Sequence, residues 1–444
     1  MSAIIGIAAR PAHAQAEIAE RDLTRIYRKI AFRIVPLIFL GYIVAYLDRI
    51  NIGFAKLQFT QDLQFSEVVY GFGAGLFFLG YFLFEVPSNL LLERVGARLT
   101  LLRIMVLWGV ISGGMAFIST PTQYYVMRFL LGVAEAGFFP GVILYLSYWF
   151  PTRVRGRMTS MFVMGSAAAG MIGAPISSLL LNMEGLHGLR GWQVLFIYEA
   201  LPAVVLAAVY FFVFTDKPSE AAWLTDVEKR LVMDDIETEN AAKPKTERSR
   251  IGAILGNPVV YVLVFAYMSV LAGTGAVSLW TPTILKSHHL SITAIGWFGM
   301  LPFVGAIIGM YCLGRSSDHF QERRLHFAGT MCVTGLSLAA LQLATWSFPL
   351  TVALLALAGT GAFSALALFW TIPPAELSET SKAAGIAFIS SFGSVGGFYS
   401  PVLVGWSTTL GGGSIYVGLA IVGLLLAVCG LSILLIRRKA VPAN

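Results

Sequence analysis

The sequence predicts an all-α integral membrane protein with twelve transmembrane helices in two six-helix halves. Of its 444 residues, 57% are hydrophobic and only 12% are charged, whereas about 25% of an average soluble domain is charged. The mean hydropathy of +0.75 points the same way. The apolar residues also fall into runs of roughly 20, the length of helix that crosses a bilayer. The alternating ten-residue strands that are typical of a membrane β-barrel do not occur.

The apolar runs define the twelve helices, because the bilayer core offers the backbone no water and helices satisfy their own hydrogen bonds. The runs centre near Tyr42, Gly80, Val110, Glu135, Ala169, Ala203, Ala272, Gly305, Ser337, Ala362, Gly396 and Gly423. Arginine is concentrated in the amino-terminal segment, in the second-to-third, fourth-to-fifth and eighth-to-ninth connections and at the carboxyl end. The opposite connections hold little beyond Lys56, Arg190 and Lys286. This bias predicts a multi-pass protein of the cell membrane, the inner membrane in a bacterium, with both termini cytoplasmic.

A long polar stretch divides the chain into its two halves. The expected organisation is a cytoplasmic segment (1–30), a first half (31–215), a cytoplasmic linker (216–255), a second half (256–437) and a cytoplasmic tail (438–444). The linker mixes charges of both signs, and we expect it to be partly amphipathic helix and partly a solvated tether. A lipid or regulatory contact is its alternative role. Charged turns at matching places in both halves are typical of a transporter built from parallel repeats.

Composition and motifs argue against several functional classes, among them a membrane enzyme and a channel. The sequence pI of about 9.3 does not indicate nucleic-acid binding, because the basic residues sit in short loops without forming a continuous face. The cysteines Cys312, Cys332 and Cys429 lie in or near apolar runs and predict packing, with no metal site or cofactor. No catalytic motif of an enzyme is present. A channel would need polar rings from several helices, but the charges gather in one half.

Charged residues inside the predicted spans are functional candidates, because burying a charge in a bilayer costs several kcal/mol. They all lie in the first half: Asp48, Arg49, Glu85, Arg128, Glu135 and Glu199. Arg49 and Arg128 are the expected anion-binding pair, since a guanidinium grips a carboxylate with two hydrogen bonds and stays charged when buried. The alternative is that both arginines only neutralise Asp48 and Glu135.

Tyrosines and hydroxyl groups complete the expected substrate site. Tyr42 and Tyr46 lie seven and three residues before Arg49 and therefore share its helical face. Tyr81, on the second span, is a further candidate. The second half offers Trp370, Thr371, Ser391 and Ser394, which could read a ring or the hydroxyl groups of a substrate.

Asp48 and Glu135 are the expected proton carriers, with a purely structural role as the alternative. Burial favours the neutral form of a carboxyl group and a nearby arginine favours the charged form, so such a group can change state during transport. A separate charge network at the cytoplasmic end is expected to stabilise one facing state without touching substrate. Its members are Glu93, Arg94, Arg98 and Asp318.

Four motifs resemble a known family. NLLLERVGAR, at Asn89–Arg98, and RFLLGVAEAGFFPG, at Arg128–Gly141, resemble the loop and fourth-helix signatures of the major facilitator superfamily. Together with YLDRINIGFA and FEVPSN, they look like its anion:cation symporter family, which includes transporters of tartrate, phthalate, hexonates and hexarates. The chain departs from the loop signature at Asn89 and Glu93, and it has Ser391 and Ser394 where relatives often carry asparagine.

The resemblance implies a major facilitator fold and proton-coupled symport of an organic carboxylate by alternating access. It also implies that the position of Arg49 contacts the substrate carboxylate. The expected partners are a small organic anion, protons and membrane lipids, and a monomer is the expected functional unit. Anion exchange or uniport remains the alternative mode of transport.

Overall fold

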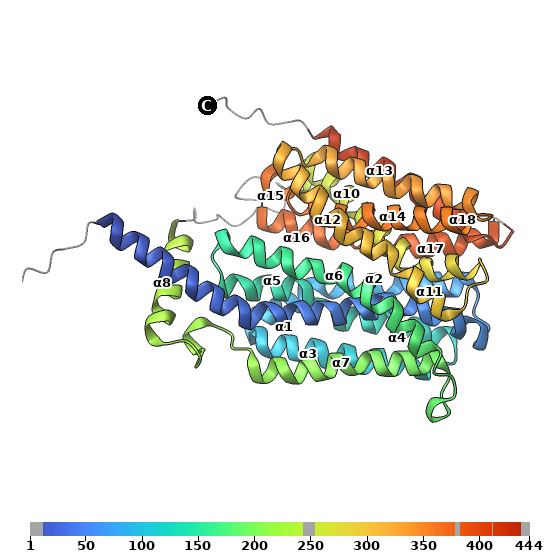
Figure 1. The fold of residues 1–444 in the computed structure, drawn as a ribbon, viewed down its shortest axis with the longest axis horizontal. Helices are drawn as coiled ribbons and strands as arrows, with labels where there is room; N and C mark the ends of the chain where they lie inside the picture. Colours follow the sequence, from blue (N-terminus) through green and yellow to red (C-terminus); the bar gives the residue numbers. More distant parts are fainter. Residues whose placement is uncertain (1–11, 243–253, 378–381, 411, 437–444) are drawn as a thin grey trace, which may run out of the picture.

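The computed structural model describes residues 12–242, 254–377, 382–410 and 412–436, and the regular structure within them is helical. Figure 1 shows the blue-to-green half lying against the yellow-to-red half, with most helices running along the long axis of the molecule. The helices of the first half and the linker are α1 (Ala12–Asp62), α2 (Glu67–Val95), α3 (Ala97–Gly114), α4 (Pro121–Glu135), α5 (Phe138–Trp149), α6 (Thr152–Leu181), α7 (Gly191–Val213) and α8 (Asp226–Ala242). Those of the second half are α10 (Pro258–Lys286), α11 (Ile292–Gly299), α12 (Leu301–Phe320), α13 (Arg324–Ala340), α14 (Phe348–Phe369), α15 (Pro373–Glu376), α16 (Lys382–Gly393), α17 (Val395–Leu410) and α18 (Ile415–Leu431).

The predicted number of spans is confirmed: within the described ranges, twelve helical segments are long and apolar enough to cross a membrane. Each predicted centre falls inside one of them. Side chains at the segment starts explain several boundaries, because they accept hydrogen bonds from the first free backbone N–H groups. Ser66 caps α2 and Thr120 caps α4 in this way. One difference is that α1 begins at Ala12 and continues to Asp62, so the segment before residue 31 is partly helical.

The fourth span is broken into α4 and α5 rather than forming one helix. Gly137 separates them with φ +92°, a left-handed conformation that favours glycine. A Cβ atom at Gly137 would also lie 2.3 Å from Ser88 Oγ. The break ends α4 at Glu135, which leaves this carboxyl at a helix terminus between the first and second spans.

We call the end of the bundle that carries α8 the linker end and the opposite end the far end. The two halves meet closely at the far end. The Asn182 side chain donates a hydrogen bond to Thr293 Oγ1 at 2.9 Å, and the Tyr70 hydroxyl donates to the Leu279 carbonyl at 3.2 Å. Gly53 lies so near α10 that a Cβ would sit 2.9 Å from a backbone oxygen. These contacts close the space between the halves on that side.

Lys56 belongs to this closure, which corrects its assignment to an outer connection. It lies inside α1 and is only 3% exposed. Its Nζ is 2.6 Å from a carboxylate oxygen of Glu67 and donates a hydrogen bond to Thr283 Oγ1 at 3.0 Å. The same ammonium group lies 4.1 Å from the ring centre of Trp280. Since Thr283 and Trp280 belong to the second half, Lys56 joins the halves at the far end.

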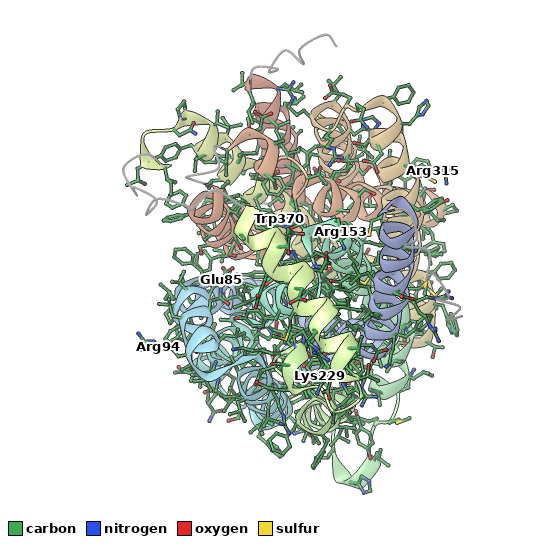
Figure 2. All side chains as sticks on the ribbon, turned by 90° about the vertical axis from the view of Figure 1, so that its left-hand side faces the viewer. Glu85, Arg94, Arg153, Lys229, Arg315 and Trp370 are labelled. Atoms are coloured by element: carbon green, nitrogen blue, oxygen red, sulfur yellow. The ribbon has the colours of Figure 1, made fainter. Side chains whose placement is uncertain are left out.

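The linker helix α8 is docked on the first half and is not a free tether. Figure 2 looks onto the linker end and shows α8 crossing it, with Lys229 and Arg153 labelled. Glu228 accepts hydrogen bonds from Lys29 at 2.8 and 2.9 Å, and Asp235 pairs with Arg153 at 2.7 Å. The hydrogen bond from Lys29 lowers the pKa of Glu228 below its ordinary value. Polar contacts therefore hold α8 against α1 and α6.

Candidate functional site

A cavity lies between the two halves, on the linker side of the closed far end. Its empty volume is about 950 Å³, part of it open to solvent. Helices α1, α2, α4, α5 and α6 line it from the first half, and α10, α14, α16 and the turns after α14 and α16 line it from the second. A partly open cavity between helices is a common place for a small-molecule site.

Arg49 and Glu135 form an ion pair at this cavity. Arg49 Nε donates a hydrogen bond to Glu135 Oε2 at 2.8 Å, and Arg49 Nη2 is 2.7 Å from the same oxygen. The Arg49 side chain is 20% exposed, whereas Glu135 is fully buried. Among the described side chains, Glu135 Oε1 has no hydrogen-bond partner. The Arg49 guanidinium therefore faces the cavity, and the Glu135 carboxylate is buried behind it.

Arg128 is the second cation at the cavity, and it is differently placed. It is 1% exposed and its guanidinium lies 5.0 Å from the ring centre of Phe77. Its Nε lacks a hydrogen-bond partner, and no carboxylate lies within 4.0 Å of it among the residues that the structure describes. A buried and uncompensated cation is costly, so this position favours an anion in the cavity.

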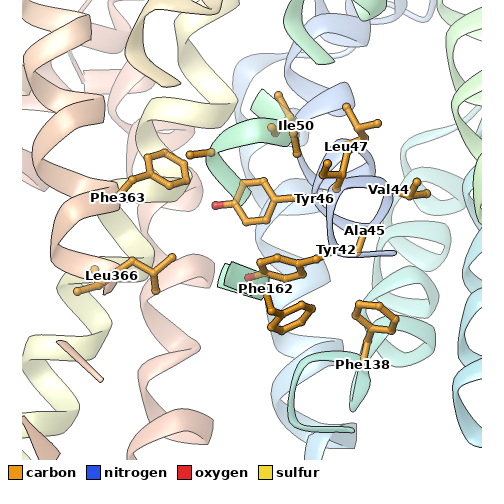
Figure 3. Packing of buried hydrophobic residues seen from close by; sticks show 14 of the residues in the cluster. Tyr42, Val44, Ala45, Tyr46, Leu47, Ile50, Phe138, Phe162, Phe363 and Leu366 are labelled. Atoms are coloured by element: carbon orange, nitrogen blue, oxygen red, sulfur yellow. The ribbon is translucent and has the colours of Figure 1, made fainter. Parts of the chain in front are cut away.

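The predicted tyrosines all lie at the cavity. Figure 3 shows Tyr42 and Tyr46 projecting from one helix towards Phe363 and Leu366 of the other half. Tyr42 packs against Phe162 with ring centres 4.4 Å apart. The Arg49 guanidinium lies 5.2 Å from the ring centre of Tyr81. The spacing in α1 thus brings an arginine and two tyrosines to one wall.

The second half supplies some of the predicted residues and others that the sequence analysis did not single out. Trp370 and Ser394 line the cavity. Thr371 is not in the lining, and its hydroxyl donates to the Leu368 carbonyl at 2.6 Å. Ser391 is also outside the lining, but its neighbour Ser390 lines it and donates to Glu85 at 2.9 Å. Further lining residues are Tyr267, Leu271, Thr274, Gly275, Ser278, Leu279 and Leu366.

Asp48 faces away from the cavity, into the first half. It is 1% exposed and accepts hydrogen bonds from the Trp108 indole, from Ser112 at 2.6 Å and from Asn51 at 3.1 Å. These donors are neutral, and neither arginine is within ion-pair distance of Asp48. Successive helical residues are rotated by about 100° about the helix axis. The side chains of the neighbours Asp48 and Arg49 therefore contact different surroundings.

Two residues of the predicted cytoplasmic network, Asp318 and Arg98, have other partners in this structure. Asp318 pairs with Arg323 at 3.1 Å in the second half. Arg98 donates from its backbone to Asp216 at 2.8 Å and from Nε to the Phe211 carbonyl at 2.7 Å. Arg94 is exposed on α2 (Figure 2), and the side chain of Glu93 lies outside the described residues. This structure therefore does not bring Asp318 to Arg98.

The described residues contain no group of three or more His, Cys, Asp or Glu side chains placed to hold a metal ion. The cavity lining carries two guanidinium groups beside aromatic rings and hydroxyl groups.

Comparison with known proteins agrees with the fold. Residues 38–401 match the family model described as Major Facilitator Superfamily. A protein of Agrobacterium vitis that is named as a candidate tartrate transporter is 44% identical over 95% of this chain and 96% of its own length. The inner membrane transport protein RhmT of Escherichia coli is 36% identical over 86% of this chain and 88% of its own.

Solved structures share the fold at much lower identity. A bacterial homologue of the human lysosomal transporter Spinster, in an inward-facing and occupied conformation, has a TM-score of 0.73 at 15% identity. The match covers 92% of this chain and 96% of that one. A D-xylose–proton symporter has a TM-score of 0.68 at 16% identity, over 90% of this chain and 97% of that one.

Proposed function

The chain belongs to the major facilitator superfamily of secondary transporters, and from this premise we propose that it carries a hydroxylated organic dicarboxylate together with protons. The observation that supports this most directly is the pair of arginines at one cavity, one bound to Glu135 and the other without a carboxylate. Two guanidinium groups suit two carboxylates. The Agrobacterium vitis relative, named as a candidate tartrate transporter, supports the same class.

The ion pair gives a route to proton coupling. One substrate carboxylate binds Arg128, and the other competes with Glu135 for Arg49. When Glu135 takes up a proton, its attraction for Arg49 falls, and the guanidinium turns to the substrate. Binding of proton and anion are then mutually favourable, since each stabilises the state that the other requires. Rocking of the halves about the site exposes it to the two sides of the membrane alternately.

Polar groups of the second half favour a substrate with hydroxyl groups over a plain aromatic diacid such as phthalate. Ser278 Oγ and Trp370 Nε1 belong to cavity-lining residues, are buried and lack hydrogen-bond partners among the described residues. Unpaired buried donors reject a ligand that cannot satisfy them. A tartrate-like anion offers hydroxyl oxygens to both.

Uptake into proteoliposomes tests the proposal. Labelled tartrate, phthalate and galactonate are supplied with and without an inward pH gradient. We expect tartrate to accumulate when the gradient is present, and Glu135→Gln to abolish this accumulation while retaining tartrate binding. Asp226→Asn, which removes an exposed carboxylate of the linker helix, is the matched control and should behave as the wild type. Uphill uptake of none of the three anions would refute the proposal.

Anion exchange is the second candidate, because the arginine site alone would support it. It predicts rapid uptake only when vesicles are preloaded with a counter-anion, with no response to the pH gradient. A wild-type protein with that behaviour would overturn proton coupling and leave the anion site in place.

A further inference from the structure

A second polar cluster lies behind α1, on the side away from the cavity. Its acidic members are Asp48 of α1 and Glu199 of α7, which are 1% and 3% exposed. Glu199 Oε1 accepts a hydrogen bond from Ser177 of α6 at 2.6 Å. Asp48 and Asn51 are three residues apart in α1 and are joined by the 3.1 Å hydrogen bond described above. The cluster is therefore built from helices of the first half alone.

The cluster contains two carboxyl groups and no cation. Asp48 and Glu199 receive hydrogen bonds from neutral groups only, and neither has an ion pair in the described part of the chain. Besides Glu199, the charged groups that interact electrostatically with Asp48 are Glu135 and Arg128 of α4. The group that acts on Glu199 is Asp48 itself. Two buried carboxylates without a cation cannot both stay ionised, so the pair holds a proton.

Asn51 is placed to connect the two carboxyl groups. Its amide interacts with Glu199 as well as with Asp48. Two buried oxygens near this contact, Asn51 Oδ1 and Glu199 Oε2, lack hydrogen-bond partners among the described residues. A proton on Glu199 Oε2 would let it donate to Asn51 Oδ1, while Asn51 Nδ2 donates to an ionised Asp48. A single proton would therefore give both Asn51 Oδ1 and Glu199 Oε2 a hydrogen-bond partner.

We propose that Asp48 and Glu199 share one exchangeable proton through Asn51, and that this pair supplies the proton from the far end by a route separate from the substrate cavity. The proton leaves Glu199 Oε2 for Asn51 Oδ1 while an Nδ2 proton of Asn51 passes to an Asp48 oxygen. The imidic acid formed at Asn51 returns to the amide when the proton moves from Oδ1 to Nδ2, so the two carboxyl groups keep a single negative charge throughout. This inference rests on the proposed proton coupling and deepens it, since it gives the buried Asp48 a source of protons.

The positions along the helices explain the direction of the route. At about 1.5 Å per residue, Glu199 lies roughly 12 Å from the far end of α7 and Ser177 roughly 6 Å from the far end of α6. Asp48 lies deeper, roughly 21 Å from the end of α1. Glu199 and Ser177 therefore stand between Asp48 and the far end, whereas the cavity lies on the other face of α1.

Transport of labelled tartrate in proteoliposomes separates a proton role from a structural one. Exchange of internal for external tartrate at equal pH needs no net proton movement, but accumulation against a gradient does. We expect the exchange rate of Glu199→Gln to stay within about twofold of the wild type. Its pH-driven accumulation of tartrate should be at least about tenfold lower than that of the wild type. Asn51→Leu, which removes the connecting amide at similar volume, should show the same division. Glu199→Asp, which retains a carboxyl, should restore part of the accumulation.

Two outcomes overturn the inference. If Glu199→Gln accumulates tartrate as the wild type does, Glu199 carries no proton for transport. If exchange and accumulation fall together in Glu199→Gln and Asn51→Leu while both variants bind tartrate and remain folded, the cluster is structural. If the wild-type protein shows no pH-driven accumulation, the proposed proton coupling is itself wrong. This outcome differs from the two above because it is seen in the wild type and not in a variant.

Discussion

The contact of Lys56 across the far end predicts how strongly one side chain biases the protein towards the closed state seen here. The contacts to Thr283 and Trp280 cross between the halves, whereas those to Glu67 and Tyr70 lie within the first half and persist when the halves separate. Only the crossing contacts bias the equilibrium between facing states. Lys56→Met removes them and keeps a side chain of similar length.

The size of the effect follows from these contacts. A hydrogen bond from a charged donor contributes about 1.5–3 kcal/mol, and a cation over a tryptophan ring contributes about 0.5–2 kcal/mol. Rehydration of the ammonium group on opening offsets part of this sum, because a buried lysine is poorly solvated. A net loss of about 1–2 kcal/mol raises the ratio of separated to closed far ends by about 5- to 30-fold.

Distance measurement between two spin labels tests this prediction. Labels at Gln61 and Ser287, exposed positions near the far ends of α1 and α10, are introduced after replacement of the three native cysteines. We expect the long-distance population to grow in Lys56→Met. Lys286→Met is the control, since Lys286 is exposed at the same end. An unchanged distribution, or a shift towards the closed distance in Lys56→Met, would refute the reasoning.

Other predictions concern affinity, the docked linker and close helix packing. Arg128→Lys should weaken tartrate binding about 10- to 100-fold in a ligand-dependent thermal shift, because lysine lacks the planar fork; unchanged affinity would remove Arg128 from the site. Glu228→Gln should free α8 for proteolysis at neutral pH. Because the Lys29 hydrogen bond lowers the pKa of Glu228, its stabilisation is present above the unfolded pKa and lost as pH falls through the lower folded value. Once Glu228 is protonated, the wild type and Glu228→Gln should be cleaved alike, and a difference that persisted there would exclude this ion pair as the cause. Gly132→Ala should cost about 1–3 kcal/mol of stability, because the new Cβ would lie 1.9 Å from a carbonyl oxygen of α2. In the control Gly329→Ala the new Cβ meets nothing within 4 Å, so this variant should not destabilise the protein. Equal melting temperatures in the two variants would contradict this.

The fold and one wall of the site could be predicted because they depend on local periodicity. Apolar runs gave the number of spans, and helical spacing brought Tyr42, Tyr46 and Arg49 to one cavity face. Periodicity could not say which residue Arg49 would bind. Its partner Glu135 is 86 positions away, and only the arrangement of the helices in space brings the two residues together.

Lys56 shows most clearly that the local sequence does not reveal contacts with distant parts of the chain. A lysine near the end of an apolar run is typical of a residue that reaches water, and the connection between the first two spans was therefore its expected place. Its actual neighbours, Thr283 and Trp280, belong to the other half of the chain. Thr371 and Ser391 illustrate the opposite error: their residue types suit a polar cavity, but the turn after α14 and the course of α16 leave them outside its lining.

The divergence of Asp48 and Arg49 around α1 has a consequence for how such a carrier could be redesigned. The proposed substrate site and the proposed proton pair occupy different faces of one helix, about 100° apart, so the cavity wall can be remodelled without disturbing the acidic pair behind it. Both faces nevertheless belong to the same helix, so a change in its register moves them together. A single residue inserted into α1 ahead of this pair would rotate both by about 100°, and it would disconnect the guanidinium from its cavity and the carboxylate from its proton source at once.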